Sequence, residues 1–167
     1  MAALTNISTK EVWSLLEQVT DPEVPVLSII DLGIVRDVQV KGSEAHIVIT
    51  PTYSGCPAMD VISMGIRMQL LASGFEKVTI SQVLSPAWTT DWMSEAGKEK
   101  LRAYGIAPPH PTPQLCNNKL FADEAAVQCP QCGSWHTRRI SEFGSTACKS
   151  LYQCQDCREP FDYFKCH

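Results

Sequence analysis

Apolar residues recur at helical spacing close to the start of the chain. They follow Ser8 and Glu11, which have the three-residue spacing of a helix-capping box. The apolar positions are Val12, Trp13, Leu15, Leu16 and Val19. This pattern predicts a helix that begins at Ser8 and ends before the segment DPEVP, because Pro22 and Pro25 cannot continue it.

Alternation of apolar and polar residues replaces the helical spacing further along. The runs IVRDVQV, residues 34–40, and AHIVIT, residues 45–50, both alternate and are joined by a polar turn that contains glycine. They therefore predict a β-hairpin. A third run, KVTISQVL at residues 77–84, predicts another strand.

A second helix is predicted between the hairpin and the third strand. Its apolar stripe consists of Met59, Ile62, Ile66 and Leu70. Gly74 offers a C-terminal cap. The order helix–strand–strand–helix–strand predicts a compact α+β domain, in which a small mixed sheet carries helices on one face.

Periodicity is lost between residues 107 and 126, where APPHPTP is typical of a semi-rigid linker. We therefore expect an α+β domain at residues 1–106, a proline-rich linker at 107–126 and a small domain at 127–167. A short helix, capped by Ser94 and ended by Gly105, would close the first domain. A chain of about 40 residues rarely buries enough apolar surface to fold alone, so the last domain is expected to need a bound metal.

Charge and composition narrow the possible partners. The net charge is −4, which argues against nucleic acid as the main partner, because binding to its backbone needs clustered basic residues. No apolar run has the length of a membrane span, and the first residues lack the pattern of a signal peptide. We therefore expect a cytoplasmic protein with reduced thiols, in which the eight cysteines indicate metal or redox chemistry.

Two C-x-x-C pairs dominate the C-terminal region: Cys129 with Cys132, and Cys154 with Cys157. Two such knuckles supply four thiolates for a tetrahedral ion, so they predict a metal ribbon. Zinc is the favoured ion, and iron remains possible because four thiolates also suit iron. His136 and His167 are not needed as ligands, because the four cysteines already complete the set.

Cys148 and Cys166 exceed the needs of one such site. They are either small residues on the ribbon strands or part of a second, exchangeable metal site.

Cys56 stands apart from the other cysteines, between Gly55 and Pro57. If Pro57 is the first helical residue, Cys56 is the N-cap, where unpaired N–H groups would lower the pKa of its thiol. The alternative is a small buried residue at a strand-to-helix connection. The nearby acidic residues Asp21, Glu23 or Asp31 could add metal ligands, or Asp21 and Glu23 could simply form the turn at the end of the first helix.

The segments DPEVPVLSIIDLGIVRDV and TPTYSGCPAMD resemble the SufT-like family of iron–sulfur assembly factors over roughly residues 8–85. That resemblance implies transient handling of iron or an iron–sulfur cluster at Cys56. It also implies that Asp21, Glu23 and Asp31 are the family's acidic positions.

The rest of the chain resembles the PaaD family of phenylacetate-degradation proteins. The residues that carry this resemblance are SPAWTTDWMSEAGKEKLRAYGIAPP, CPQCGS and ISEFGSTACKSLYQCQDCREPFDYFKC. It implies an accessory factor, without turnover of its own, for the multicomponent phenylacetyl-CoA epoxidase. The partners would be the reductase with its [2Fe–2S] cluster or the di-iron oxygenase subunits. A structural or electron-transfer subunit of the epoxidase is the alternative, and a homodimer remains open.

Trp88 and Trp92 lie four positions apart in the segment AWTTDWM. An exposed tryptophan pair is typical of a surface that docks a partner. Packing of both rings against the sheet is the alternative.

Overall fold

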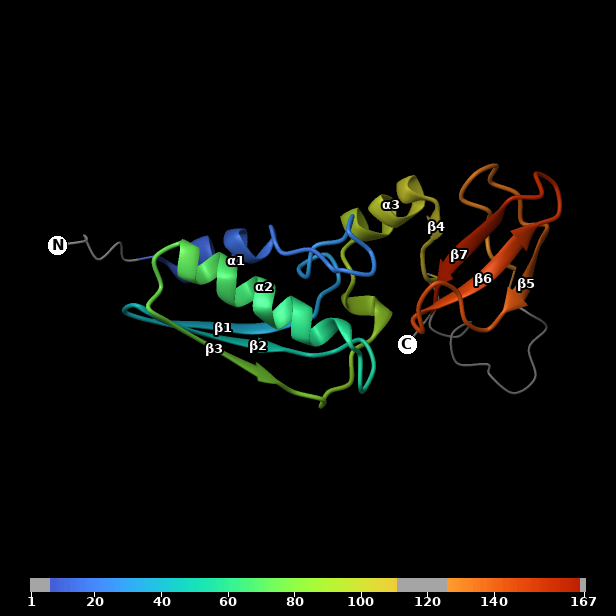
Figure 1. Cartoon of the computed structure of the whole chain (residues 1–167). Helices are drawn as coiled ribbons and strands as arrows, with labels where there is room; N and C mark the ends of the chain where they lie inside the picture. Colours follow the sequence, from blue (N-terminus) through green and yellow to red (C-terminus); the bar gives the residue numbers. More distant parts are fainter. Residues whose placement is uncertain (1–6, 111–125, 166–167) are drawn as a thin grey trace. The chain divides into compact units, whose positions relative to one another are not determined.

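The computed structural model describes residues 7–110 and 126–165 (Figure 1). The chain divides into two compact units between Ser94 and Glu95. Within the described ranges, no helix has the length and apolar character needed to cross a membrane.

The N-terminal unit is a three-stranded mixed sheet with two helices on one face (Figure 1). Strands β1 and β2 form the expected antiparallel hairpin, and β3 pairs with β2 in parallel. The elements are α1 (Thr9–Leu16), β1 (Val35–Lys41), β2 (Glu44–Ile49), α2 (Ala58–Ala72), β3 (Lys77–Gln82) and the short helix η1 (Thr90–Trp92). The predicted α+β architecture is therefore confirmed.

Alternation along the strands positions the core. In β2, Ala45, Ile47 and Ile49 are buried, whereas Glu44 is exposed and His46 and Val48 are half-buried. The sheet therefore presents its apolar side to the helices. Helix α2 contributes the predicted stripe to this core, namely Met59, Ile62, Ile66 and Leu70.

Two of the helix ends that the sequence marks, at Ser8 and Gly74, form as predicted. The Ser8 hydroxyl accepts a hydrogen bond from the Glu11 backbone N–H, and the Glu11 carboxylate accepts one from the Ser8 N–H at 2.7 Å. At the end of α2, Gly74 has a φ of +104° and donates to the Leu71 carbonyl oxygen. The next N–H, of Phe75, reaches the Leu70 carbonyl oxygen at 3.2 Å, which completes a Schellman motif.

The segment that follows β3 packs on the turn that precedes β1. The indole N–H of Trp88 donates to the Leu32 carbonyl oxygen at 2.9 Å, and the Trp88 side chain is 3% exposed. Gly33 lies against the backbone of Trp92, where a Cβ would overlap with the carbonyl oxygen. A side chain at position 33 is therefore incompatible with this packing.

The C-terminal unit contains more of the chain than the sequence pattern indicates. It begins with α3 (Glu95–Tyr104) and β4 (Ile106–Ala107) and continues with β5 (Thr137–Ser141), β6 (Lys149–Cys154) and β7 (Pro160–Phe164). Strand β4 pairs in parallel with β7 and completes a sheet of order β4-β7-β6-β5. The expected boundary near residue 106 thus differs from the division at Ser94, because a two-residue strand carries no periodicity and is defined only by its distant partner.

Gly33→Ala is expected to lower the free energy of unfolding of the N-terminal unit by about 2–4 kcal/mol. The added Cβ would meet the Trp92 backbone, and the φ of +69° disfavours any side chain. Urea denaturation followed by tryptophan fluorescence would measure the change. Gly42→Ala is the matched control, because Gly42 also has a positive φ, of +59°, but no atom lies within 4 Å of the point that its Cβ would occupy. Equal losses for the two variants would contradict the packing argument.

Candidate metal centre and thiol site

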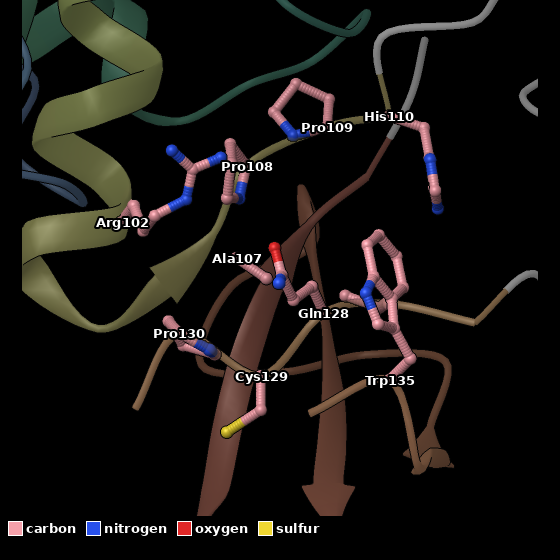
Figure 2. A pocket seen from close by; sticks show the side chains of 10 residues that line it. Arg102, Ala107, Pro108, Pro109, His110, Gln128, Cys129, Pro130 and Trp135 are labelled. Carbon is pink, nitrogen blue, oxygen red and sulfur yellow. The ribbon is translucent and has the colours of Figure 1, made fainter. Parts of the chain in front are cut away.

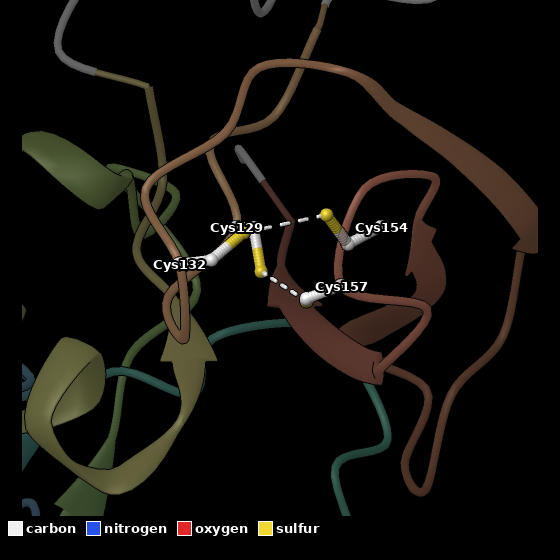
Figure 3. Close-up of side chains that lie close together, drawn as sticks. All are labelled: Cys129, Cys132, Cys154 and Cys157. Carbon is white, nitrogen blue, oxygen red and sulfur yellow. Dashed lines mark hydrogen bonds between the residues drawn. The ribbon is translucent and has the colours of Figure 1, made fainter.

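Four cysteines converge at one end of the ribbon sheet (Figure 3). Cys129 and Cys132 come from the loop before β5, whereas Cys154 is the last residue of β6 and Cys157 lies in the turn between β6 and β7. Their four sulfur atoms all lie within 4.8 Å of one another. Within residues 7–110 and 126–165, this is the only group of three or more potential metal ligands.

The sulfur spacing fits a single tetrahedral ion. The Cys129 and Cys157 sulfurs are 3.8 Å apart, and those of Cys132 and Cys154 are 3.5 Å apart. Four sulfurs placed about 2.3 Å from a central zinc ion would be about 3.8 Å apart. The donor set and the spacing therefore both suit one zinc or one iron ion, whereas a cluster would spread its thiolates over several metals.

Backbone hydrogen bonds shape both knuckles. In the first, the Gly133 N–H donates to the Cys129 carbonyl oxygen at 2.9 Å, and Gly133 has a φ of +74°. In the second, the equivalent position is Arg158, which has a φ of +67°. The Cys154 N–H donates to the Glu159 carbonyl oxygen at 3.0 Å. Both cysteine pairs are thus held in tight turns that direct the sulfurs toward one point.

The thiols of the cluster differ in acidity. Hydrogen bonds from the Cys157 and Asp156 backbone N–H groups lower the pKa of Cys154 to about 6. The Glu159 N–H lowers the pKa of Cys157, but burial and the neighbouring thiols Cys132, Cys154 and Cys129 outweigh it and raise the value to about 12. A divalent ion must therefore displace protons from the cluster, so metal affinity should weaken as the pH falls.

The remaining ribbon candidates lie outside this cluster. Cys148 is buried, and its sulfur lies 3.0 Å from the Thr146 hydroxyl. His136 is exposed, and its Nδ1 lies 3.1 Å from an Asp156 carboxylate oxygen. Cys166 and His167 lie outside the described residues.

Cys56 lies in the loop between β2 and α2, one residue earlier than the sequence predicts relative to the helix. Pro57 is the N-cap of α2, and the Cys56 carbonyl oxygen accepts a hydrogen bond from the Met59 N–H at 3.3 Å. The thiol is free and half-buried. His46 lies on β2, and its Nε2 is hydrogen-bonded to the Ser81 hydroxyl on β3. The imidazole of His46 therefore interacts with the neighbouring strand.

The pKa of the Cys56 thiol is raised, so the predicted lowering is wrong. Burial is the largest cause. Hydrogen bonds from the Ala58 backbone N–H and the Tyr53 side chain lower the pKa, as a helix N-terminus should. The negative charges of Glu23 and Asp21 raise it again. Desolvation and acidic neighbours together therefore outweigh the helix end.

The three acidic candidates have different environments. One Asp21 carboxylate oxygen accepts the backbone N–H groups of Glu23 and Val24 at 2.7 and 2.8 Å, so Asp21 forms the turn after α1. Asp31 is 6% exposed, and its carboxylate accepts the Ser94 hydroxyl at 2.8 Å. The Asp31 carboxylate is thus used within the fold, whereas Asp21 and Glu23 act electrostatically on Cys56.

The two tryptophans do not form an exposed pair. Trp88 is buried, which is the core-packing alternative that the sequence left open. Trp92 is half-buried, and the Arg36 guanidinium lies 3.6 Å from the centre of its ring. A docking role for Trp88 is therefore excluded by its burial, since its ring has no free face to offer.

A small cavity lies beside the first knuckle within the C-terminal unit (Figure 2). Its volume is about 80 Å³, below the roughly 300 Å³ of a typical ligand pocket. Arg102, Ala107, Cys129 and Trp135 are among its lining residues. The cavity walls show that the chain after α3 packs directly on the ribbon.

Sequence reasoning missed several residues that support these sites. Tyr53 contacts the Cys56 thiol. The Ser134 hydroxyl donates to the Asp156 carboxylate and so joins the two knuckles. Ser94 was expected only as a helix cap, although it also holds Asp31. No local spacing signals these pairs, except that Tyr53 lies on the same turn as Cys56.

Two family models match separate parts of the chain. Residues 9–81 match a model described as an iron-sulfur cluster assembly protein. Residues 114–165 match the PaaD zinc beta ribbon domain. Cys56 lies in the first match, and the four clustered cysteines lie in the second.

Individual relatives cover the same two parts. The chain is 51% identical over 166 residues to an Escherichia coli protein designated as one of the subunits of a 1,2-phenylacetyl-CoA epoxidase, covering 99% of this chain and 98% of that protein. It is 35% identical over 89 residues to an Fe-S protein maturation auxiliary factor of Porphyromonas gingivalis, covering 52% of this chain and 83% of the relative. Among solved structures, a domain of unknown function, DUF59, from Bacillus anthracis matches with a TM-score of 0.52 at 29% identity. That match covers 56% of this chain and 90% of the other.

Cys154→Ser is expected to abolish stoichiometric metal binding, because the variant removes one of four clustered ligands. Metal analysis of the purified chain should find about one zinc ion in the unmodified protein and much less in the variant. Cys148→Ser is the matched control and should keep its zinc, since Cys148 lies outside the cluster. Loss of zinc from Cys148→Ser alone would contradict this ligand set.

Glu23→Gln is expected to speed alkylation of Cys56 by iodoacetamide at pH 8. The Glu23 charge raises the pKa of Cys56, so its removal lowers that pKa and increases the thiolate fraction below the pKa. An increase of about two- to threefold fits the loss of one partly exposed charge near the thiol. Mass spectrometry of the Cys56 peptide would give the rate. Glu17→Gln is the matched control: it removes the same charge at an exposed position of the N-terminal unit and should leave the alkylation rate unchanged. An equal increase in both variants would contradict a specific effect of Glu23.

Proposed function

Because this chain belongs to the PaaD family, we propose that it is a maturation factor that passes iron or an iron–sulfur cluster to a phenylacetyl-CoA epoxidase. The observation that carries the proposal is the half-buried free thiol of Cys56, which lies in a domain that matches iron–sulfur cluster assembly proteins. The Escherichia coli relative supports the epoxidase as the client.

The environment of Cys56 suits a transient acceptor of a cation. Burial and the charges of Asp21 and Glu23 keep the thiol protonated at neutral pH. The same charges attract Fe²⁺, so an iron–sulfur bond forms as the thiol proton leaves to solvent. One thiolate holds iron weakly, because the remaining ligands must come from the donor or the client. The cargo can therefore leave as readily as it arrives.

The ribbon has a separate task in this proposal. Cys129, Cys132, Cys154 and Cys157 would hold one zinc ion that stabilises the C-terminal unit. Structural zinc of this kind contributes on the order of 10 kcal/mol to folding and has no redox chemistry. The proposal requires reduced thiols, as in the cytoplasm, and none of the six cysteines that the structure describes forms a disulfide.

A second candidate is a structural or electron-transfer subunit of the epoxidase, which the designation of the Escherichia coli relative favours. Electron transfer would need iron in the ribbon, because zinc cannot change its oxidation state. A purified chain that contains only zinc would therefore exclude the electron-transfer version of this candidate, and co-purification with the epoxidase at fixed stoichiometry would support a structural subunit.

Cys56→Ser is expected to fold normally and to keep its zinc, but to leave the client epoxidase inactive and deficient in iron. The reason is that a hydroxyl replaces the only thiol of the assembly domain. Epoxidase purified from cells that express this variant would be assayed for activity, iron and acid-labile sulfide. Cys148→Ser serves as the matched control and should support full activation. Full activation by Cys56→Ser would overturn the proposed function.

A further inference from the structure

Helix α2 has a second apolar face that points away from the sheet. Four large side chains on it are exposed: Val61 by 57%, Met64 by 64%, Met68 by 66% and Leu71 by 48%. Their spacings of three, four and three residues place them in one stripe along the helix. We call these four residues the α2 stripe. The opposite face of the same helix is the one that packs in the core.

The fold does not require the α2 stripe. A helix that covers a sheet normally exposes a polar face, and α1 follows this rule, because Lys10, Glu11 and Ser14 are exposed. A row of neighbouring exposed apolar residues, in contrast, is typical of an interaction surface. Methionine suits such a surface because its flexible side chain adapts to partners of different shape.

The size of the α2 stripe indicates a transient contact. Four side chains exposed to this extent offer on the order of 400 Å² of apolar surface, about half of the roughly 800 Å² that each partner buries in a stable complex. A permanent dimer through this face would need a larger surface. A carrier that must release its partner has use for a smaller one.

The charges around the α2 stripe define its partner further. Residues 7–94 contain ten Asp and Glu but five Lys and Arg. On α2 itself, the exposed Asp60 and Arg67 balance each other, so the excess of negative charge near the α2 stripe comes from Asp21 and Glu23, which act on the thiol that precedes the helix. A complementary partner therefore carries basic residues near the Cys56 end of an apolar segment.

The α2 stripe also begins close to Cys56. Cys56 immediately precedes the N-cap Pro57, and Val61 lies about 5 Å along the helix axis from Ala58, the first helical residue. The stripe then extends about 15 Å further. A polypeptide seated on it would thus have one end beside the thiol.

We propose that the α2 stripe is the surface on which the apo form of the client docks, through an apolar segment that carries Lys or Arg near its Cys56 end. This inference rests on the proposed function and adds to it the place where the client binds. Docking there would bring the client's empty ligand site next to Cys56.

Binding to a double variant, Met64→Glu with Met68→Glu, tests this docking surface. The probes are the purified apo reductase and the purified apo oxygenase subunits of the epoxidase, measured by biolayer interferometry against the full chain at low and high salt. We expect at least a tenfold rise in Kd for the component that binds, and weaker binding of the unmodified chain at high salt. Ser14→Glu, which adds a charge at an exposed position on α1, should bind normally.

Three results would overturn the inference. The double variant could bind within twofold of the unmodified chain, or no epoxidase component could bind the unmodified chain. Sedimentation could instead show that the double variant dissociates a dimer without weakening client binding, which would assign the α2 stripe to self-association. Far-UV circular dichroism must show an unchanged fold; if it does not, Met64→Gln with Met68→Gln repeats the measurement without added charge.

Different variants test the docking surface and the proposed function, so either hypothesis can be wrong without the other. Cys56→Ser should bind the client normally, because Cys56 is not part of the α2 stripe. If Cys56→Ser binds and also activates the client, the proposed chemistry is wrong, while the binding data for the double variant still decide the docking surface.

Discussion

The loops around Cys56 in the N-terminal unit depend on the hydrogen bonds of one buried carboxylate, that of Asp31. A buried carboxylate is costly unless hydrogen bonds satisfy it, and here the Ser94 hydroxyl donates to it while the Ser94 N–H donates to the Asp31 carbonyl oxygen. Next to this pair, Trp88 donates to Leu32. These contacts tie the chain before β1 to the chain after β3. The Asp31 carboxylate also accepts the Ser28 N–H, and Ser28 pairs with Thr20 across the loop that carries Asp21 and Glu23. The same carboxylate therefore helps to fix the charges that act on Cys56.

Features that depend only on residues close together in the chain could be predicted from the sequence. The capping box at Ser8 and the cap at Gly74 formed as expected, because each depends only on the conformation of one helix end. The hairpin could be predicted because its two alternating runs, residues 34–40 and 45–50, are neighbours in the chain. The ribbon cysteines could also be identified, since a C-x-x-C pair brings two sulfurs together locally and the ion has to join only two such pairs.

Features that depend on distant partners could not be predicted. Ser94 is 63 positions from Asp31, so nothing near Asp31 indicates that its carboxylate serves the fold. The acidity of Cys56 was predicted with the wrong sign, because the helix end is a local feature whereas burial and the position of Glu23 are tertiary ones. Strand β4 exists only through its pairing with β7, which also explains why the unit boundary differed from the expected one.

The two ribbon knuckles have unequal backbones, and this affects how readily each adopts its final shape without an ion. Gly133 adopts its left-handed conformation at no steric cost, whereas the same conformation costs Arg158 on the order of 1 kcal/mol. Before any ion is present, the first knuckle should therefore adopt its final shape about five times more often than the second. The first knuckle is therefore the better preorganised half of the site, whereas the second contains the more acidic thiol, Cys154.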